Sequence, residues 1–124
     1  MLQSAGLVAF AASTDLDRSQ AFYQDVLGLT LVSRDDFACV FDSAGTMLRV
    51  TAVPEPARAA YTVLGWEVPD IAATARGLTA RGVTFLRYDV MDQDADGIWT
   101  APSGARIAWF PDPDDNVLSL TQPA

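Results

Sequence analysis

The residue types that this chain lacks restrict the chemistry that it can perform. It contains no His and no Lys, so a Ser–His or Cys–His nucleophile pair, a His-based zinc or iron site, a Schiff base and a phosphate-loop lysine are excluded. Cys39 is the only cysteine, which rules out an internal disulfide and a Cys-x-x-Cys motif. No neighbouring residue would make it a thiolate, so we interpret Cys39 as a small buried hydrophobe.

An acidic segment at residues 92–98 has the spacing of the first half of a calcium loop. Asp92, Asp94 and Asp96 alternate with other residues, and Gly97 holds the sixth position. The twelfth position requires a bidentate Glu, but it is Ser103, and no helix is predicted on either side. We therefore favour a solvated acidic turn, while the sequence leaves calcium binding open.

Three aromatic residues near this segment, Tyr88, Trp99 and Trp109, are candidates for binding a planar ligand. Their rings could stack on such a ligand, and Trp99 would then lie near the mouth of the site. The alternative is that they pack across a module or subunit interface. The sequence favours neither interpretation.

The charge balance argues against several classes of partner. Sixteen acidic and eight basic residues give a net charge of −8, which disfavours binding to nucleic acid and to anionic membrane surfaces. No apolar run approaches the ~20 residues that span a bilayer, and the start of the chain lacks the basic residues of a signal peptide. With its single Cys, the chain is expected to be cytoplasmic.

The sequence repeats itself, which indicates two copies of one supersecondary unit. Residues 28–32 (GLTLV) resemble residues 82–86 (GVTFL), and residues 47–51 (MLRVT) resemble residues 117–121 (VLSLT). The extra residues of the second copy fall in the polar insertion at 89–97. We expect residues 1–124 to form one domain, with module one at about 1–56 and module two at about 57–124.

Each copy is predicted to be a strand, a helix and then further strands, an α+β fold. Thr14 or Asp15 caps the first helix, which Gly28 ends, and Asp70 begins the second, which Gly82 ends. In the second helix Ile71, Ala75 and Leu78 share one face. Apolar alternation predicts strands around 7–10 and 62–65, and then at 29–34, 37–41, 47–53, 83–88, 98–101, 106–110 and 117–121. The predicted order is β-α-β-β-β, twice.

Three motifs in this order resemble the vicinal oxygen chelate superfamily, which includes glyoxalase I, extradiol dioxygenases and bleomycin-resistance proteins. They are residues 15–23 (DLDRSQAFY), 26–29 (VLGL) and 110–116 (FPDPDDN). Asp115 stands where the family turn has Gly, and Asp tolerates the left-handed conformation better than most residues. The resemblance implies two βαβββ modules that form a curled mixed sheet cup with helices outside, a small-molecule ligand inside, and a homodimer.

In the metal-dependent members, four inward side chains hold a divalent ion. The resemblance carries these positions to Val8, Arg49, Val63 and Ser119, and the internal repeat pairs them in the same way. Two valines cannot ligate, arginine only donates hydrogen bonds, and serine is a poor ligand. We therefore expect neither a metal nor another cofactor, and the glyoxalase and dioxygenase chemistries, which need the ion, are not expected.

Strand alternation predicts what else lines the cup. Arg49 and Glu67 are the charged groups that we place inside, where they either pair with each other or leave Arg49 to bind an anionic or carbonyl group of the ligand. The predicted ligand-binding residues are Val8, Phe10, Cys39, Phe41, Arg49, Thr51, Val63, Glu67, Trp99, Trp109 and Ser119.

These residues predict a metal-independent small-molecule binding protein with an apolar or aromatic ligand. The alternative is a metal-independent isomerase or lyase, in which Glu67 is the general base and Arg49 stabilises an oxyanion. A third interpretation is a vestigial cup, filled by its own side chains, in an interaction module. The sequence leaves open which ligand is bound, whether the protein is an enzyme, and its oligomeric state.

Overall fold

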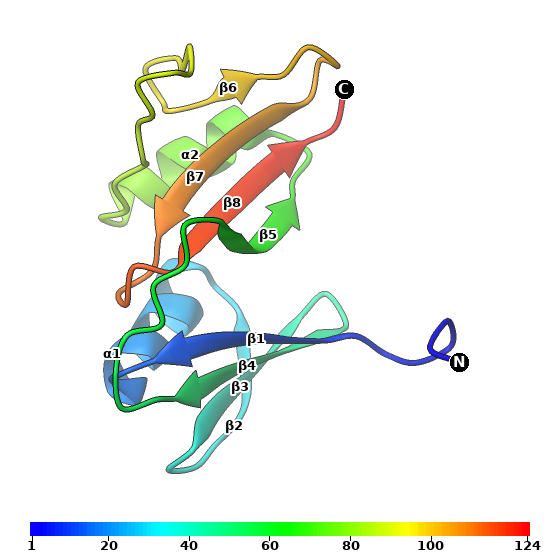
Figure 1. The fold of residues 1–124 in the computed structure, drawn as a ribbon, viewed down its shortest axis with the longest axis vertical. Helices are drawn as coiled ribbons and strands as arrows, with labels where there is room; N and C mark the ends of the chain where they lie inside the picture. Colours follow the sequence, from blue (N-terminus) through cyan, green and yellow to red (C-terminus); the bar gives the residue numbers. More distant parts are fainter. The chain divides into compact units, whose positions relative to one another are not determined.

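A computed structural model describes all residues from 1 to 124 and divides them into two compact units, Met1–Ala57 and Arg58–Ala124. Each unit contains a four-stranded mixed sheet and a helix in β-α-β-β-β order (Figure 1). The predicted α+β fold of two βαβββ modules is thus confirmed.

Unit one consists of β1 (Val8–Ser13), α1 (Leu16–Ala21), the π-helical turn η1 (Phe22–Val26), β2 (Thr30–Arg34), β3 (Ala38–Ser43) and β4 (Thr46–Ala52). The strand order is β1-β4-β3-β2, with β1 parallel to β4 and the other pairs antiparallel. Asp15 caps α1 by accepting a hydrogen bond of 3.1 Å from the Arg18 amide, and Gly28 has a φ of 77°, as expected for a helix-ending residue. The sequence predicted this helix without its π-helical turn.

The helical segment covers one face of this sheet and forms the core of unit one with it. Tyr23 of η1 is fully buried against Phe41 of β3, with ring centroids 5.7 Å apart. Leu48 and Val50 of β4 are buried in the same layer. Because residues alternate between the two faces of a strand, Arg49 and Thr51 lie on the face opposite the helix. This second face is called open face one.

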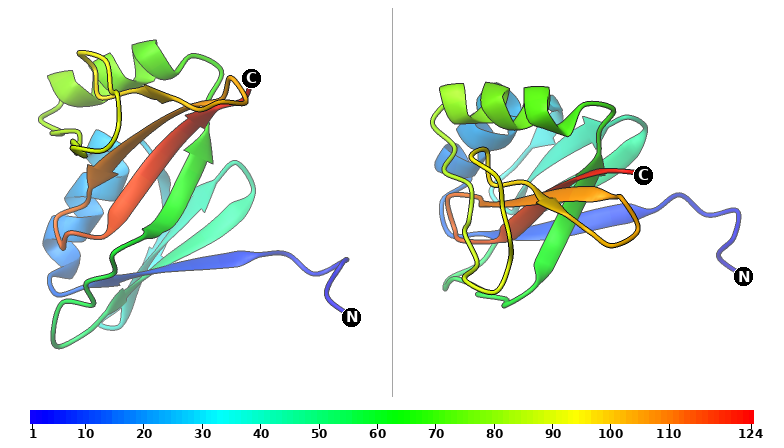
Figure 2. Two further views of the ribbon diagram at one scale, coloured as in Figure 1. Left: turned by 45° about the horizontal axis from the view of Figure 1, so that its top comes forward. Right: turned by 90° about the horizontal axis from the view of Figure 1, so that it is seen from above.

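Unit two consists of β5 (Thr62–Glu67), α2 (Ile71–Ala80), β6 (Trp99–Thr100), β7 (Arg106–Pro111) and β8 (Val117–Gln122), in the strand order β5-β8-β7-β6. Asp70 caps α2, and Ile71, Ala75 and Leu78 are buried, as predicted. Leu118, Leu120 and Phe110 are buried on the sheet face that α2 covers (Figure 2). The other face is called open face two.

The predicted strand at residues 83–88 is wrong. This segment is bound to β7 by one backbone hydrogen bond, from the Leu86 amide to the Trp109 carbonyl at 2.8 Å. The Tyr88 amide donates instead to Gln93 Oε1 at 2.8 Å, so no second strand ladder develops. The predicted strand at 98–101 is reduced to Trp99 and Thr100.

The turn between β7 and β8 forms around Asp112. Its Oδ1 atom accepts hydrogen bonds of 2.9 Å from the amides of Asp114 and Asn116, and its Oδ2 atom accepts one of 2.7 Å from the Asn116 side chain. Asp115 has a φ of 63°, so it adopts the left-handed conformation that we expected of it. In neither unit is there a helix with the length and apolar character needed to cross a bilayer.

Candidate functional site

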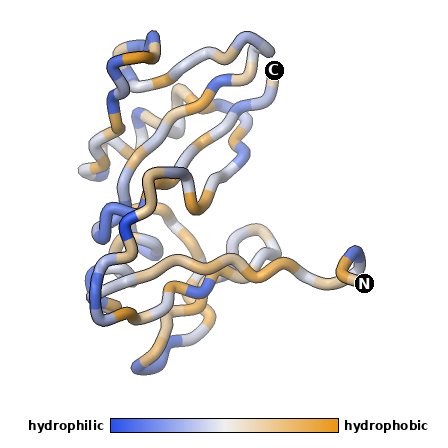
Figure 3. The backbone as a smooth tube through the Cα atoms, in the orientation of Figure 1, coloured by the Kyte–Doolittle hydropathy of each residue, from blue (hydrophilic) through white to orange (hydrophobic).

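Open face one combines exposed apolar side chains with one arginine. The strand register pairs Phe10 with Arg49 and Val8 with Met47 between β1 and β4, and it pairs Val40 with Arg49 between β3 and β4. Phe10, Met47 and Val8 are 60, 43 and 41% exposed. Most of β1 consists of hydrophobic residues (Figure 3). Val8, Phe10, Arg49 and Thr51 therefore lie on one face, as alternation predicted.

The polar groups of this face are not satisfied within the unit. Arg49 is half-buried and its guanidinium forms no hydrogen bond or ion pair, whereas that of Arg34 on the helix side contacts Asp17 at 2.8 Å. The Oγ1 atom of Thr51 is buried without a hydrogen-bond partner. Asp35 accepts from the amides of Phe37 and Ala38 at 2.8 and 2.9 Å. These two amides, and then the charge of Arg49, lower the pKa of Asp35.

Cys39 and Phe41 are not on this face, so their predicted place in the ligand-binding wall is wrong. Cys39 pairs with Val50 on the helix side, and its Sγ atom lies 3.8 Å from the Leu16 carbonyl oxygen. Phe41 packs on Tyr23, and both Cys39 and Phe41 are fully buried. Burial raises the pKa of the Cys39 thiol, as expected for an inert core cysteine.

Open face two brings together Ser119, Trp109 and Gly65. Ser119 pairs with Trp109 of β7 on one side and with Gly65 of β5 on the other. A Cβ atom at Gly65 would lie 2.7 Å from Ser119 Oγ, so only glycine leaves room for this hydroxyl. Glu67 is exposed and its carboxylate forms no hydrogen bond or ion pair, and Val63 lies at a register irregularity between Thr62 and Leu64.

The three predicted aromatic residues form one cluster within unit two. The Trp109 ring centroid lies 5.5 Å from that of Tyr88 in an edge-on arrangement and 6.3 Å from that of Trp99. Trp109 and Tyr88 also line a pocket of about 210 Å³, called the aromatic pocket. Its other lining residues are Ala60, Tyr61, Thr62, Val90, Met91 and Val117. The cluster therefore packs on itself and still leaves a concavity beside two of its rings.

Sequence reasoning missed Tyr61, Val90 and Met91 as wall residues of the aromatic pocket. Val90 and Met91 lie inside the polar insertion at 89–97, where two adjacent apolar residues were the available signal. Val90 is 93% exposed and Tyr61 is 71% exposed, so this part of the wall is open to solvent.

The side chains of an arginine and of Asp94 hold the acidic loop, residues 92–98, in its conformation. The Arg87 guanidinium donates to the carbonyls of Asp94 and Ala95 at 2.6 and 2.8 Å. The Asp94 carboxylate accepts from the amides of Asp96 and Ile98 at 2.9 Å each. The Asp94 carboxylate and the carbonyls of Asp94 and Ala95 are thus already bound to donors of the protein itself, which favours the solvated turn over calcium binding.

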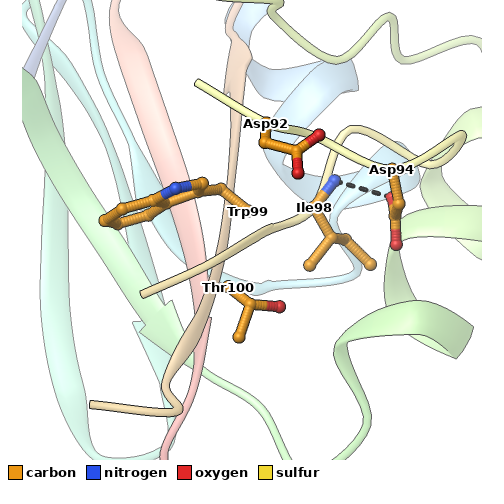
Figure 4. Close-up of a pocket in the computed structure, with 5 residues that line it drawn as sticks. All are labelled: Asp92, Asp94, Ile98, Trp99 and Thr100. Atoms are coloured by element: carbon orange, nitrogen blue, oxygen red, sulfur yellow. Dashed lines mark hydrogen bonds between the residues drawn. The ribbon is translucent and has the colours of Figure 1, made fainter. Parts of the chain in front are cut away.

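A second pocket, of about 270 Å³, lies on this loop and is lined by Asp92, Asp94, Ile98, Trp99 and Thr100. In Figure 4 the Trp99 indole points away from the side chains of Asp94 and Thr100, and the Ile98 amide donates to Asp94. No group of three or more His, Cys, Asp or Glu residues is arranged to hold a metal ion.

The four positions to which the family resemblance assigns a metal ion do not fit one here. Val8 and Val63 have no donor atom, Arg49 has only hydrogen-bond donors, and the Ser119 hydroxyl is a weak ligand. No reaction step through a metal is therefore derived for this chain.

Each unit has a mixed sheet with one face covered by a helix and the other face open. A chain with two such units belongs to the class of proteins built from paired βαβββ modules. Residues 7–120 match the model of the Glyoxalase/Bleomycin resistance protein/Dioxygenase superfamily, and the chain belongs to that superfamily. No curated protein matches the chain in sequence.

Solved structures of similar fold cover nearly the whole chain. A bleomycin resistance determinant encoded on the transposon Tn5 is 24% identical, with 97% of this chain and 98% of that chain covered and a TM-score of 0.74. TnmS3, an antibiotic binding protein from Streptomyces sp. CB03234, is 23% identical, with coverage of 100 and 99% and a TM-score of 0.76. Lactoylglutathione lyase from Agrobacterium tumefaciens is 20% identical, with coverage of 98 and 96% and a TM-score of 0.76. At these identities the likeness concerns the fold alone.

Proposed function

We propose that the protein binds a small apolar or aromatic molecule without a metal ion, and that the open faces of its sheets supply the contacts. The observation that carries this proposal is the aromatic pocket, where Trp109 and Tyr88 flank a concavity of about 210 Å³. Aromatic walls with a few polar groups are typical of small-molecule sites.

The apolar character of open face one supports the same function. Phe10, Val8 and Met47 are exposed around Arg49, although burial would have been favourable for each of them. Two of the proteins with similar folds are described as an antibiotic binding protein and a bleomycin resistance determinant. A binding role for this chain is consistent with those descriptions. We further propose a cytoplasmic homodimer, since Leu7 and Phe37 of unit one are 76 and 73% exposed.

Native mass spectrometry of the protein, purified without added metal or chelator, tests the proposal first. We expect a metal-free dimer, and any co-purified organic mass would indicate the ligand class. A stoichiometric divalent ion would contradict the metal-independent assignment of Val8, Arg49, Val63 and Ser119.

A binding measurement tests the aromatic pocket directly. Titration with 2-naphthamide, a neutral planar probe, should quench tryptophan fluorescence. Trp109→Ala should weaken binding about tenfold or more, because the stacking of a planar ring on an aromatic side chain contributes about 1–3 kcal/mol. Trp109→Phe should weaken it less, and Val32→Ala, which removes an exposed apolar side chain of β2, should leave it unchanged. Equal affinity in wild type and Trp109→Ala would contradict the proposal.

No observation favours the enzyme alternative over binding. A general base that works near neutral pH is normally desolvated and held by a hydrogen bond. Glu67 is exposed and has no such partner. Glu67→Gln should therefore leave the affinity for 2-naphthamide within about threefold of wild type, which corresponds to less than 1 kcal/mol.

A further inference from the structure

The centre of open face one combines two polar groups that lack partners. Arg49 is half-buried and its guanidinium forms no hydrogen bond or ion pair. Thr51, two residues further along the same face of β4, has a buried Oγ1 atom with no hydrogen-bond partner. Buried polar atoms are nearly always hydrogen-bonded in folded proteins, so an orphan hydroxyl beside a free guanidinium requires an explanation.

We propose that Arg49 and Thr51 form a binding subsite for the carboxylate of a monoanionic ligand with an apolar body. This inference rests on the proposed binding function and specifies its ligand class. The planar guanidinium matches a carboxylate with two parallel hydrogen bonds, and such charge-assisted bonds are strong and directional. The Thr51 hydroxyl donates to one of the same oxygens or to a neighbouring ligand oxygen.

The neighbours of Arg49 explain why the rest of the ligand is apolar. Phe10 and Val40 are its register partners on the two adjacent strands, and Met47 precedes it on the same face of β4. A carboxylate that reaches Arg49 therefore carries its remaining atoms over Phe10 and Met47, which are exposed in the free protein. Low polarity around the guanidinium also strengthens its attraction for an anion.

Two carboxylates of the protein near Arg49 disfavour a ligand that carries more than one negative charge. Asp42 pairs with Met47 on the same face, and Asp35 is close enough to Arg49 for the arginine to lower its pKa. Asp35 does not neutralise Arg49, because no ion pair forms between them and its Oδ1 atom accepts two backbone amides. A dianion such as a phosphate monoester would be repelled by both acids.

Isothermal titration calorimetry with three naphthalene probes tests the subsite on the full chain. The probes are 2-naphthoate, its neutral isostere 2-naphthamide, and the dianion 2-naphthyl phosphate. We expect 2-naphthoate to bind to open face one about tenfold or more tightly than the amide does at that face, because one charge-assisted pair distinguishes them there. The phosphate should bind more weakly than the carboxylate.

Variants of Arg49 and Thr51 then show which of these residues cause the preference for the carboxylate. Arg49→Met should abolish the preference for the carboxylate and should change the affinity for the amide by about threefold at most. Arg49→Lys, which keeps the positive charge, should retain part of the preference for the carboxylate. Thr51→Val, nearly isosteric, should reduce the preference about fivefold. Arg76→Met, which removes an exposed arginine paired with Asp96, is the matched control and should change nothing.

The outcomes separate the subsite from the binding function. If the amide binds in a Trp109-dependent manner but the carboxylate preference is absent, or survives in Arg49→Met, the subsite is wrong and the binding function stands. A stronger affinity for the phosphate than for the carboxylate would also overturn the monoanionic subsite. If none of the probes binds, both proposals are overturned. Circular dichroism confirms that each variant is folded before its affinity is interpreted.

Discussion

At the scale of single residues, the close approach of Gly65 to Ser119 sets the shape of open face two. A Cβ atom at position 65 would lie 2.7 Å from the Ser119 hydroxyl, whereas one at Gly77 of α2 would meet nothing within 4 Å. Gly65→Ala should lower the free energy of unfolding by about 1–2 kcal/mol, because Ser119 must rotate away. Gly77→Ala, the control, should raise it by about 0.5–1 kcal/mol. Urea denaturation measures both.

The double variant identifies the atom responsible for this loss. Ser119→Ala removes the hydroxyl and should restore most of the stability that Gly65→Ala loses. The losses of stability of the two single variants would simply add in the double variant if they were independent. Such a sum would show that the hydroxyl is not the cause.

At the scale of elements, the position of Tyr88 in the aromatic pocket depends on one side chain of the neighbouring loop. Gln93 accepts from the Tyr88 amide at 2.8 Å and donates to the carbonyls of Leu86 and Gly97 at 2.9 Å each. Gln93→Ala should destabilise unit two by about 2–3 kcal/mol, since three backbone groups lose their partner. It should also weaken the near-ultraviolet circular dichroism of the Tyr88–Trp109 pair.

Gln93→Glu separates the two roles of this side chain. A carboxylate still accepts from the Tyr88 amide but cannot donate to the two carbonyls. We expect a loss of stability close to that of Gln93→Ala. A variant as stable as wild type would contradict the importance of the two donated bonds.

The turn between β2 and β3 introduces a pH dependence. The amides of Phe37 and Ala38, with Arg49, lower the pKa of Asp35 from its ordinary value of 3.8. Stability from this carboxylate is fully present above that value and is lost as the pH falls through the lowered pKa. Asp35→Asn keeps an acceptor but has no charge, so its difference from wild type should shrink as the pH falls from 6 towards 2. A constant difference across urea denaturations at these pH values would contradict this assignment.

The ends of the helices were predictable because they are encoded locally. Asp15 and Asp70 cap the two helices, and Gly28 and Gly82 follow them in the left-handed conformation. The order of elements along the chain and the faces of β1, β4 and β8 were also predictable from alternation and from the internal repeat. The π-helical turn at Phe22–Val26 has no such local signal.

The face of β3 was not predictable from alternation. Ala38, Cys39, Val40 and Phe41 are all at least 94% buried, so no polar residue distinguishes one face from the other. We expected Cys39 and Phe41 on the ligand side, whereas contact with Tyr23 places Phe41 on the helix side. The segment 83–88 was equally ambiguous, because the Tyr88 amide and the Leu86 carbonyl bond to the side chain of Gln93, whose role depends on the folded loop.

At the scale of the whole molecule, the two units are joined by a segment that trypsin should cut first. Residues 54–58 are exposed, and Arg58 begins unit two without any hydrogen bond or ion pair. Exposed connecting segments are preferred sites of proteolysis. Limited digestion followed by mass spectrometry should therefore find fragments 1–58 and 59–124 before other products. Initial cleavage within β7 or α2 would contradict this division of the chain.

The parallel pairing of the first and last strands of each unit has a mechanical consequence. β1 and β4 run in the same direction across six register pairs, and β5 pairs with β8 in the same way. A force that pulls the two ends of a unit apart acts along both strands in opposite senses, so it loads all the hydrogen bonds of the ladder together. An antiparallel hairpin pulled at its open end would instead release them one after another. Each module is consequently built to withstand stretching along its strands, and a molecular machine that pulls the chain from one end must first shear its β1–β4 or β5–β8 ladder.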